Sequence, residues 1–82
     1  MKTFIYKSLE DLIEGIKAYK RQYKKRLKFM VTEKPAKKLI GIEDVDREYY
    51  WSLPYKIAEK LAITDRSLGL LAAKLSTKPR KK

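Results

Sequence analysis

A run of basic residues in the first third of the chain has a spacing that suits phosphate binding. Its members, with no acidic residue between them, are Lys17, Lys20, Arg21, Lys24, Lys25, Arg26 and Lys28. On a helix, positions 17, 21, 24 and 28 share one face because they lie three or four residues apart. The end of a helix that favours cations is its C-terminal end, where the dipole is negative. We therefore interpret the run as a phosphate-binding surface.

Two other interpretations of this run remain open. A run of charges often forms a solvated face that binds nothing. A basic amphipathic helix can also lie on an anionic membrane or in the groove of a partner. The aromatic residues near the run are Tyr rather than Trp, which disfavours the membrane.

Four acidic residues close together raise the question of metal chemistry. Glu43, Asp44, Asp46 and Glu48 could hold Mg²⁺, as a nuclease would require. The chain has no His to act as a general base or zinc ligand, no Cys, and no Gly-rich phosphate loop. A helix cap and ion pairs with lysines account for the acids more simply. We expect no catalytic residue, no metal, no cofactor and no enzymatic activity.

The overall charge points to a polyanionic partner. The chain has 82 residues, 21 Lys and Arg against 10 Asp and Glu, and a formal charge of +11. Solubility alone requires a magnitude of only about 2–8 on a small domain. A field of this size gives fast, salt-sensitive binding to polyphosphates. Nucleic acid is the expected partner, with DNA ahead of RNA or a ribosome-associated role. The further alternative is a protein-interaction module or small inhibitor that docks its basic face on an acidic partner.

The composition also bears on the compartment. No Cys is present for disulfides, the first residues lack the apolar stretch of a signal peptide, and no uncharged run is long enough to span a membrane. We expect a cytoplasmic protein with no membrane partner. Asn is absent and Gln22 is the single Gln, alongside abundant charged residues. This depletion is typical of thermophile proteins.

The elements that must position these residues are predicted from periodicity. Residues 3–7 alternate weakly, as in a short strand. Ser8 and Asp11 form a capping box, and apolar residues then recur every three or four positions, which predicts a helix over 8–25. The segments on either side of Pro35 predict a β-hairpin at about 26–43, although residues 27–30 could instead prolong the helix.

The second half of the chain reads as mostly helical. Asp44 or Asp46 can cap a short helix through Tyr49, Tyr50 and Trp51. We assign the rings of these three residues and of Tyr55 to the core rather than to base stacking. Helical periodicity continues over 54–61 and again over 65–76, with Thr64 or Asp65 as the cap. We predict an α+β domain over residues 1–76, mostly helical, with one hairpin and a C-terminal helix pair, followed by a flexible basic tail over 77–82.

The C-terminal helix pair carries a recognisable pattern. Small residues occupy positions 58 and 62, and the apolar positions are Ile57, Leu61, Ile63, Leu68 and Leu71. Over residues 54–75 this pattern resembles helix-turn-helix DNA-binding domains. The resemblance implies binding to double-stranded DNA in a transcription-regulatory or architectural role.

The same resemblance implies roles for individual residues. Arg66, Ser67 and Lys74 would face the groove, while the basic run and the tail residues Lys78 and Arg80 would hold phosphates. The exposed face of the second helix also carries Leu70 and Ala73, which suit packing better than base reading. The alternative is therefore a helical hairpin that closes the core or forms a homodimer interface.

Overall fold

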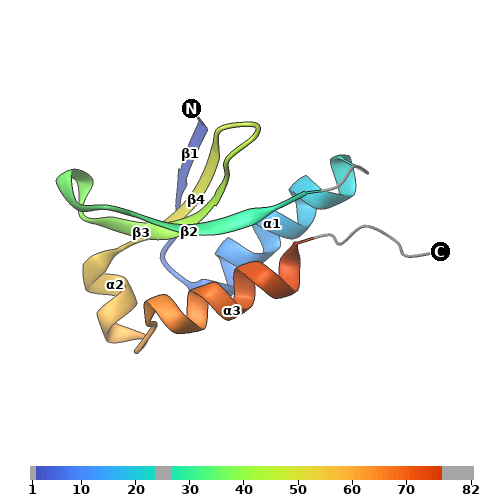
Figure 1. Ribbon diagram of the computed structural model, residues 1–82. Helices are drawn as coiled ribbons and strands as arrows, with labels where there is room; N and C mark the ends of the chain where they lie inside the picture. Colours follow the sequence, from blue (N-terminus) through green and yellow to red (C-terminus); the bar gives the residue numbers. More distant parts are fainter. Residues whose placement is uncertain (1, 24–26, 77–82) are drawn as a thin grey trace.

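The computed structural model describes residues 2–23 and 27–76 (Figure 1). It contains β1 (Lys2–Ile5), α1 (Leu9–Gln22), β2 (Phe29–Lys34), a 3-10 turn η1 (Pro35–Lys37), β3 (Leu39–Asp44), β4 (Tyr49–Pro54), α2 (Tyr55–Lys60) and α3 (Asp65–Leu75). The strands form one mixed sheet in the order β1-β4-β3-β2. The prediction of a mostly helical domain with a single hairpin is therefore wrong. The two strands expected at about 26–43 are present as β2 and β3, within a four-stranded sheet.

The main error concerns residues 49–51, which belong to the strand β4 and not to a helix. β4 pairs with β1 in parallel and with β3 in the antiparallel sense, so both of its edges are occupied. Trp51 and Leu53 point to the helices, whereas Tyr50 points to the opposite face and is also buried. Aromatic residues suit such a strand, and the pairing on both sides outweighs local helix capping by the preceding acids.

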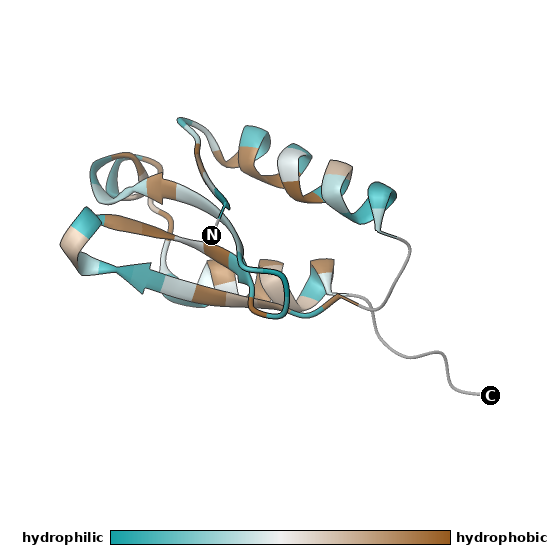
Figure 2. Cartoon of the chain, turned by 90° about the horizontal axis from the view of Figure 1, so that it is seen from above, coloured by the Kyte–Doolittle hydropathy of each residue, from teal (hydrophilic) through white to brown (hydrophobic). Residues whose placement is uncertain are grey.

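Both long helices cover the same face of the sheet. α1 packs against β4 and α3 packs against β2, and their apolar residues meet the strands in one core. Figure 2 shows the apolar side of α1 turned toward the strands. Leu12 and Ile16 of α1 and Leu68 of α3 are at most 1% exposed. The two helices run in the same direction, so their C-terminal ends lie at the same end of the molecule (Figure 1).

The first helix begins as predicted and ends earlier. Ser8 is the N-cap, and its hydroxyl accepts a hydrogen bond from the Asp11 N–H at 3.2 Å. The helix ends at Gln22, and Tyr23 is already extended, so the predicted end at residue 25 is wrong. Gly15 has a packing role in this helix, because a Cβ there would meet the Tyr6 hydroxyl.

The sheet is strongly curled, with β1 and β4 turned steeply away from β2 and β3 (Figure 1). Gly41 of β3 pairs with Ser52 of β4, and an added Cβ there would come within 2.6 Å of the Ser52 Cα. The Tyr50 hydroxyl reaches across β3 and donates to the Thr32 carbonyl at 2.8 Å. The close approach of β3 and β4 at this pair therefore requires a residue without a side chain at position 41.

Candidate nucleic-acid interface

The basic run is divided by the end of α1. Lys17 and Arg21 are exposed on the last two turns of the helix, and Lys20 is half-buried. Lys28 is exposed, but it lies just before β2, so the expectation that it shares a helical face with Lys17 and Arg21 is wrong. Lys24 and Lys25 lie outside the described residues.

Lys28 and the end of α3 are nevertheless brought together. The Phe29 N–H donates to the Ser76 Oγ at 3.0 Å, which fixes the end of α3 beside the start of β2. Lys74 is exposed on the last turn of α3. We use the name basic end for the basic residues on the last turns of α1 and α3 and just before β2, which are Lys17, Lys20, Arg21, Lys28 and Lys74. The predicted tail residues Lys78 and Arg80 lie outside the described residues.

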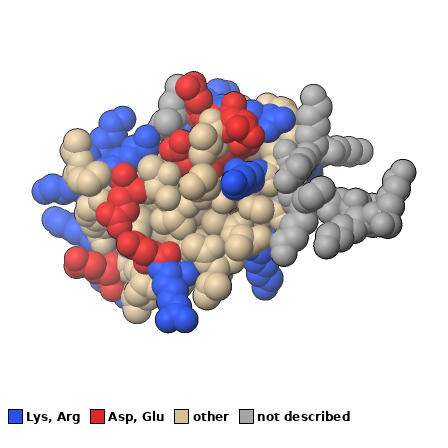
Figure 3. Space-filling view, in the orientation of Figure 1, with Lys and Arg blue, Asp and Glu red and all other residues tan. Residues whose placement is uncertain are grey.

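Acidic residues border this region on one side. The exposed residues Asp46 and Glu48 belong to the β3–β4 turn, and Figure 3 shows acidic side chains gathered over that turn. Arg47 lies between them, 3.7 Å from the buried carboxylate of Asp44. Phosphate contacts are therefore more favourable on the side of the helix ends than on the side of this turn.

Asp44 has a structural part in this region. It is fully buried, and the Tyr19 hydroxyl donates to its Oδ2 at 2.6 Å. Burial, followed by this hydrogen bond, raises the pKa of Tyr19 well above the ordinary tyrosine value. A carboxylate held in this way serves to fix α1 to the sheet. Among the described residues, no group of three or more acidic side chains is arranged to hold a metal ion.

The outer face of α3 is partly basic and partly apolar. Leu68, Ala72 and Leu75 are buried, while Arg66, Leu70, Ala73 and Lys74 are exposed. Thr64 caps the helix, and Ser67, which was also predicted to face the groove, takes part in this cap. The Ser67 hydroxyl donates to the Thr64 carbonyl at 2.8 Å and accepts from the Thr64 N–H at 2.9 Å. A contact from Ser67 to a base edge would compete with this cap.

The turn between α2 and α3 has one feature of interest. Ala62 adopts a positive φ of 57°, at the position where the helix-turn-helix pattern usually has Gly. Ala58 and Leu68 are buried at the contact between this pair and the sheet. Leu61, an apolar position of the pattern, is 47% exposed. The helix pair thus has a tight turn, with one of its apolar positions open to solvent.

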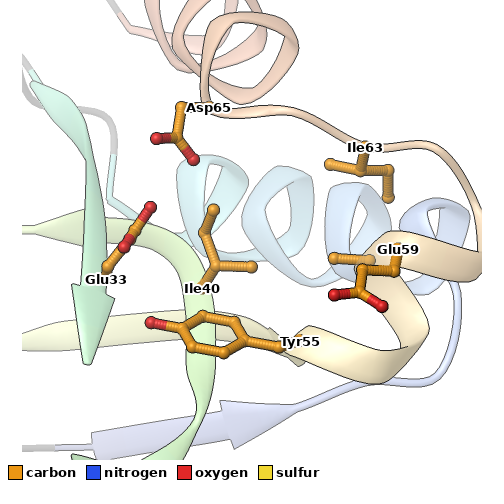
Figure 4. A pocket seen from close by; sticks show the side chains of 7 residues that line it. Glu33, Ile40, Tyr55, Glu59, Ile63 and Asp65 are labelled. Atoms are coloured by element: carbon orange, nitrogen blue, oxygen red, sulfur yellow. The ribbon is translucent and has the colours of Figure 1, made fainter. Parts of the chain in front are cut away.

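A cavity beside this turn is acidic. It encloses about 310 Å³ and is lined by Glu33, Ile40, Tyr55, Ala58, Glu59, Ile63 and Asp65 (Figure 4). Hydrogen bonding with the Asp65 carboxyl, together with its charge, raises the pKa of Glu33. Two carboxylates that compete for a proton make this cavity unsuitable for phosphates.

A second cavity, which the sequence did not reveal, lies between β1 and α1. Its residues include Lys2 and Phe4, neither of which the charge pattern or the helix pattern indicates. The alternation of Phe4 and Tyr6 along the first strand was the signal that could have found it. The rings predicted to be core are partly so: Tyr50 and Trp51 are buried, whereas Tyr49 and Tyr55 are half-buried.

Within residues 2–23 and 27–76, no helix has the length and apolar character needed to cross a membrane. Comparison of the chain with known protein families, with curated proteins and with solved structures finds no match.

Proposed function

We propose that this chain binds nucleic acid, and that the basic end holds the phosphates of duplex DNA. The observation that carries the proposal is the hydrogen bond from Phe29 to Ser76. This contact holds the last turn of α3, which carries Lys74, beside the residue that follows Lys28. The basic last turns of α1 lie at the same end of the molecule (Figure 1). Residues 15–23 and 66–76 contain no acidic residue, so these two stretches have no carboxylate to neutralise the basic groups.

The orientation of the helices adds to this argument. Both helices end at the basic end, where the partial negative charge of each dipole stabilises nearby cations. The helix dipoles therefore offset part of the electrostatic repulsion between the basic side chains at this end. DNA phosphates bound at the basic end would relieve that repulsion further, while the Lys and Arg side chains replace the counterions condensed on the DNA.

Contacts of this kind position a protein on DNA without selecting a sequence. Arg66, exposed near the start of α3, is the described residue best suited to reading a base edge, by bidentate contact with guanine. Any selection of sequence by this chain is therefore expected to depend on Arg66, and the affinity on the basic end.

A pair of fourfold variants tests the proposal. The first replaces Lys17, Arg21, Lys28 and Lys74 by Ala, all of them exposed. The control replaces Lys7, Lys37, Lys56 and Lys60, which are also exposed but lie toward the start of α1, in η1 and in α2. Both variants lose the same net charge, so a difference between them reports the location of the contacts.

Duplex DNA binding is measured across a series of salt concentrations. With about four to six phosphates neutralised, log K should fall with log salt at a slope of roughly −4 to −5. The first variant should bind more weakly and flatten the slope by about 2–4, at unchanged helicity by circular dichroism. The control should keep most of the affinity and most of the salt slope. Equal losses in the two variants, or a wild-type affinity independent of salt, would overturn the proposal, and stronger binding to structured RNA of the same sequence would reassign the surface to RNA.

A further inference from the structure

The groove between β1 and α1 has the lining of a site for a flat ring. It encloses about 320 Å³, within the range of small-molecule pockets, which begins at roughly 300 Å³. Five of its nine lining residues are aromatic, and α1 contributes the small residues Gly15 and Ala18 together with Tyr19 and Gln22. The residues around it are Lys2, Phe4, Tyr6, Gly15, Ala18, Tyr19, Gln22, Tyr49 and Trp51.

The floor of the groove is an extended aromatic surface. The ring of Phe4 lies 6.2 Å from that of Tyr49 and 6.4 Å from that of Trp51, at interplanar angles of 25° and 18°. The planes of the three rings differ by 25° or less, so the rings form one stacked cluster. Phe4 is 38% exposed, whereas Trp51 is 1% exposed, so Phe4 is the ring of this cluster that a ligand can reach. A nucleobase can stack on such a face whatever its sequence.

The side of the groove opposite these rings is formed by α1. At Gly15 the Tyr6 side chain closes the groove, because the Tyr6 hydroxyl occupies the place where a Cβ would lie. Ala18, one turn further along α1, is exposed and contributes a single methyl group. A larger residue at position 18 would fill the groove from the helix side without entering the core.

The two ends of the groove differ in charge. The Lys2 ammonium lies 5.9 Å from the centre of the Tyr49 ring, and Gln22, the last residue of α1, also lines the groove. At the Tyr6 end, burial and then the negative charge of Asp11 raise the pKa of Tyr6. Lys2 is the only basic residue among the described residues that line the groove, and its backbone N–H donates to the Glu48 carbonyl of the acidic β3–β4 turn. A phosphate is therefore favoured near the Lys2 ammonium on the side that faces α1, away from that turn.

From this lining and this charge distribution, we infer that the groove between β1 and α1 is a slot for an unpaired nucleobase, with its phosphate directed toward Lys2 and the basic end. The inference rests on the proposed function and adds that the nucleic acid bound includes an unpaired nucleotide. Stacking on Phe4 supplies the affinity for the base, and the basic end binds the adjoining phosphates.

The single Trp of the chain, Trp51, makes a direct test possible because it lines the groove. The full chain is titrated with a short single-stranded oligoadenylate and, separately, with an abasic strand of equal length, while Trp51 fluorescence is recorded. The oligoadenylate should quench the fluorescence and bind about tenfold more tightly than the abasic strand, as expected for stacking of a base. Phe4→Leu should lower its affinity by about tenfold, and Ala18→Leu should remove the quenching.

A control variant, Ile5→Val, changes the exposed neighbour of Phe4 on the opposite face of β1 and should bind like the wild type. The inference is overturned if the abasic strand binds as well as the oligoadenylate, or if Phe4→Leu and Ala18→Leu both bind like the wild type. It is overturned too if Phe4→Leu abolishes self-association in light scattering without affecting the oligoadenylate, since the groove then joins two copies. Duplex DNA binding by the same preparations distinguishes the two proposals, because it depends on the basic end and not on Phe4.

Discussion

The outer face of α3 should tolerate a charge at position 70. Leu70 is 67% exposed, so folding removes about a third of its side chain from water. Full burial of a leucine stabilises by about 1.5–3 kcal/mol, which makes the share of Leu70 about 0.5–1 kcal/mol. Leu70→Lys also places a cation one turn from Arg66 and one turn from Lys74, at about 0.2–0.5 kcal/mol for each like-charge pair. The expected total loss is about 1–2 kcal/mol.

The matched control is Leu68→Lys, the same change two positions earlier on the same helix. Leu68 is 1% exposed, so an unpaired charge there would cost several kcal/mol and should prevent folding. Urea denaturation followed by Trp51 fluorescence gives the free energies of unfolding. If α3 approaches DNA, the added charge of Leu70→Lys should also raise the affinity for duplex DNA.

A loss of stability in Leu70→Lys as large as that in Leu68→Lys would refute this reasoning. So would a wild-type stability that rises with protein concentration and ceases to do so in Leu70→Lys. That result would assign the outer face of α3 to a homodimer interface, one of the alternatives that the sequence left open.

Three further changes test individual features. Hydrogen bonding with Asp65 raises the folded-state pKa of Glu33, so the wild type loses stability as pH rises through that pKa. Glu33→Gln should therefore melt at a higher temperature at pH 7, with the difference closing toward pH 4, and an equal difference at both pH values would contradict this. Gly41→Ala should lower the free energy of unfolding by at least about 1–3 kcal/mol, because its Cβ would meet backbone atoms. Gly69→Ala, whose Cβ would meet nothing within 4 Å, should raise it by about 0.5–1 kcal/mol. Urea denaturation of both variants checks the opposite signs. Tyr19→Phe should cost about 1.5–3 kcal/mol at pH 7, since Asp44 loses a hydrogen bond. The pKa of Tyr19 is raised from 10.0, so its stabilisation is lost above pH 10, and the deficit of the variant should narrow in alkaline melts.

The first helix was predictable because its signals are local. A capping serine at position 8 and an apolar stripe identify it from the sequence alone. The overrun at its C-terminal end arose because Lys and Arg are good helix formers, and nothing local marks Tyr23 as extended. β4 was missed for the opposite reason. Both of its faces are buried, so Tyr50 between Tyr49 and Trp51 hides the alternation that usually identifies a strand.

The candidate site was predictable to a similar extent. The basic turns of α1 are visible as a run of charge, and the sequence alone placed Lys17, Lys20 and Arg21 together. The position of the last turn of α3, which carries Lys74, beside the start of β2 depends on how α3 docks on the sheet, which periodicity does not specify. The groove at Phe4 depends on the parallel pairing of β1 with β4, a contact between distant parts of the chain.

That parallel pairing also bears on the order in which the chain assembles. Lys2 pairs with Tyr49, whereas β2, β3 and β4 are joined by short turns. Closing the longer loop costs more conformational entropy, so the three antiparallel strands should form first and β1 should join them late. In the native protein, β1 should then be the strand that detaches most readily, and its amides should exchange with solvent first. Detachment would dismantle the floor of the groove at Phe4 while leaving Lys28 and Lys74 in place.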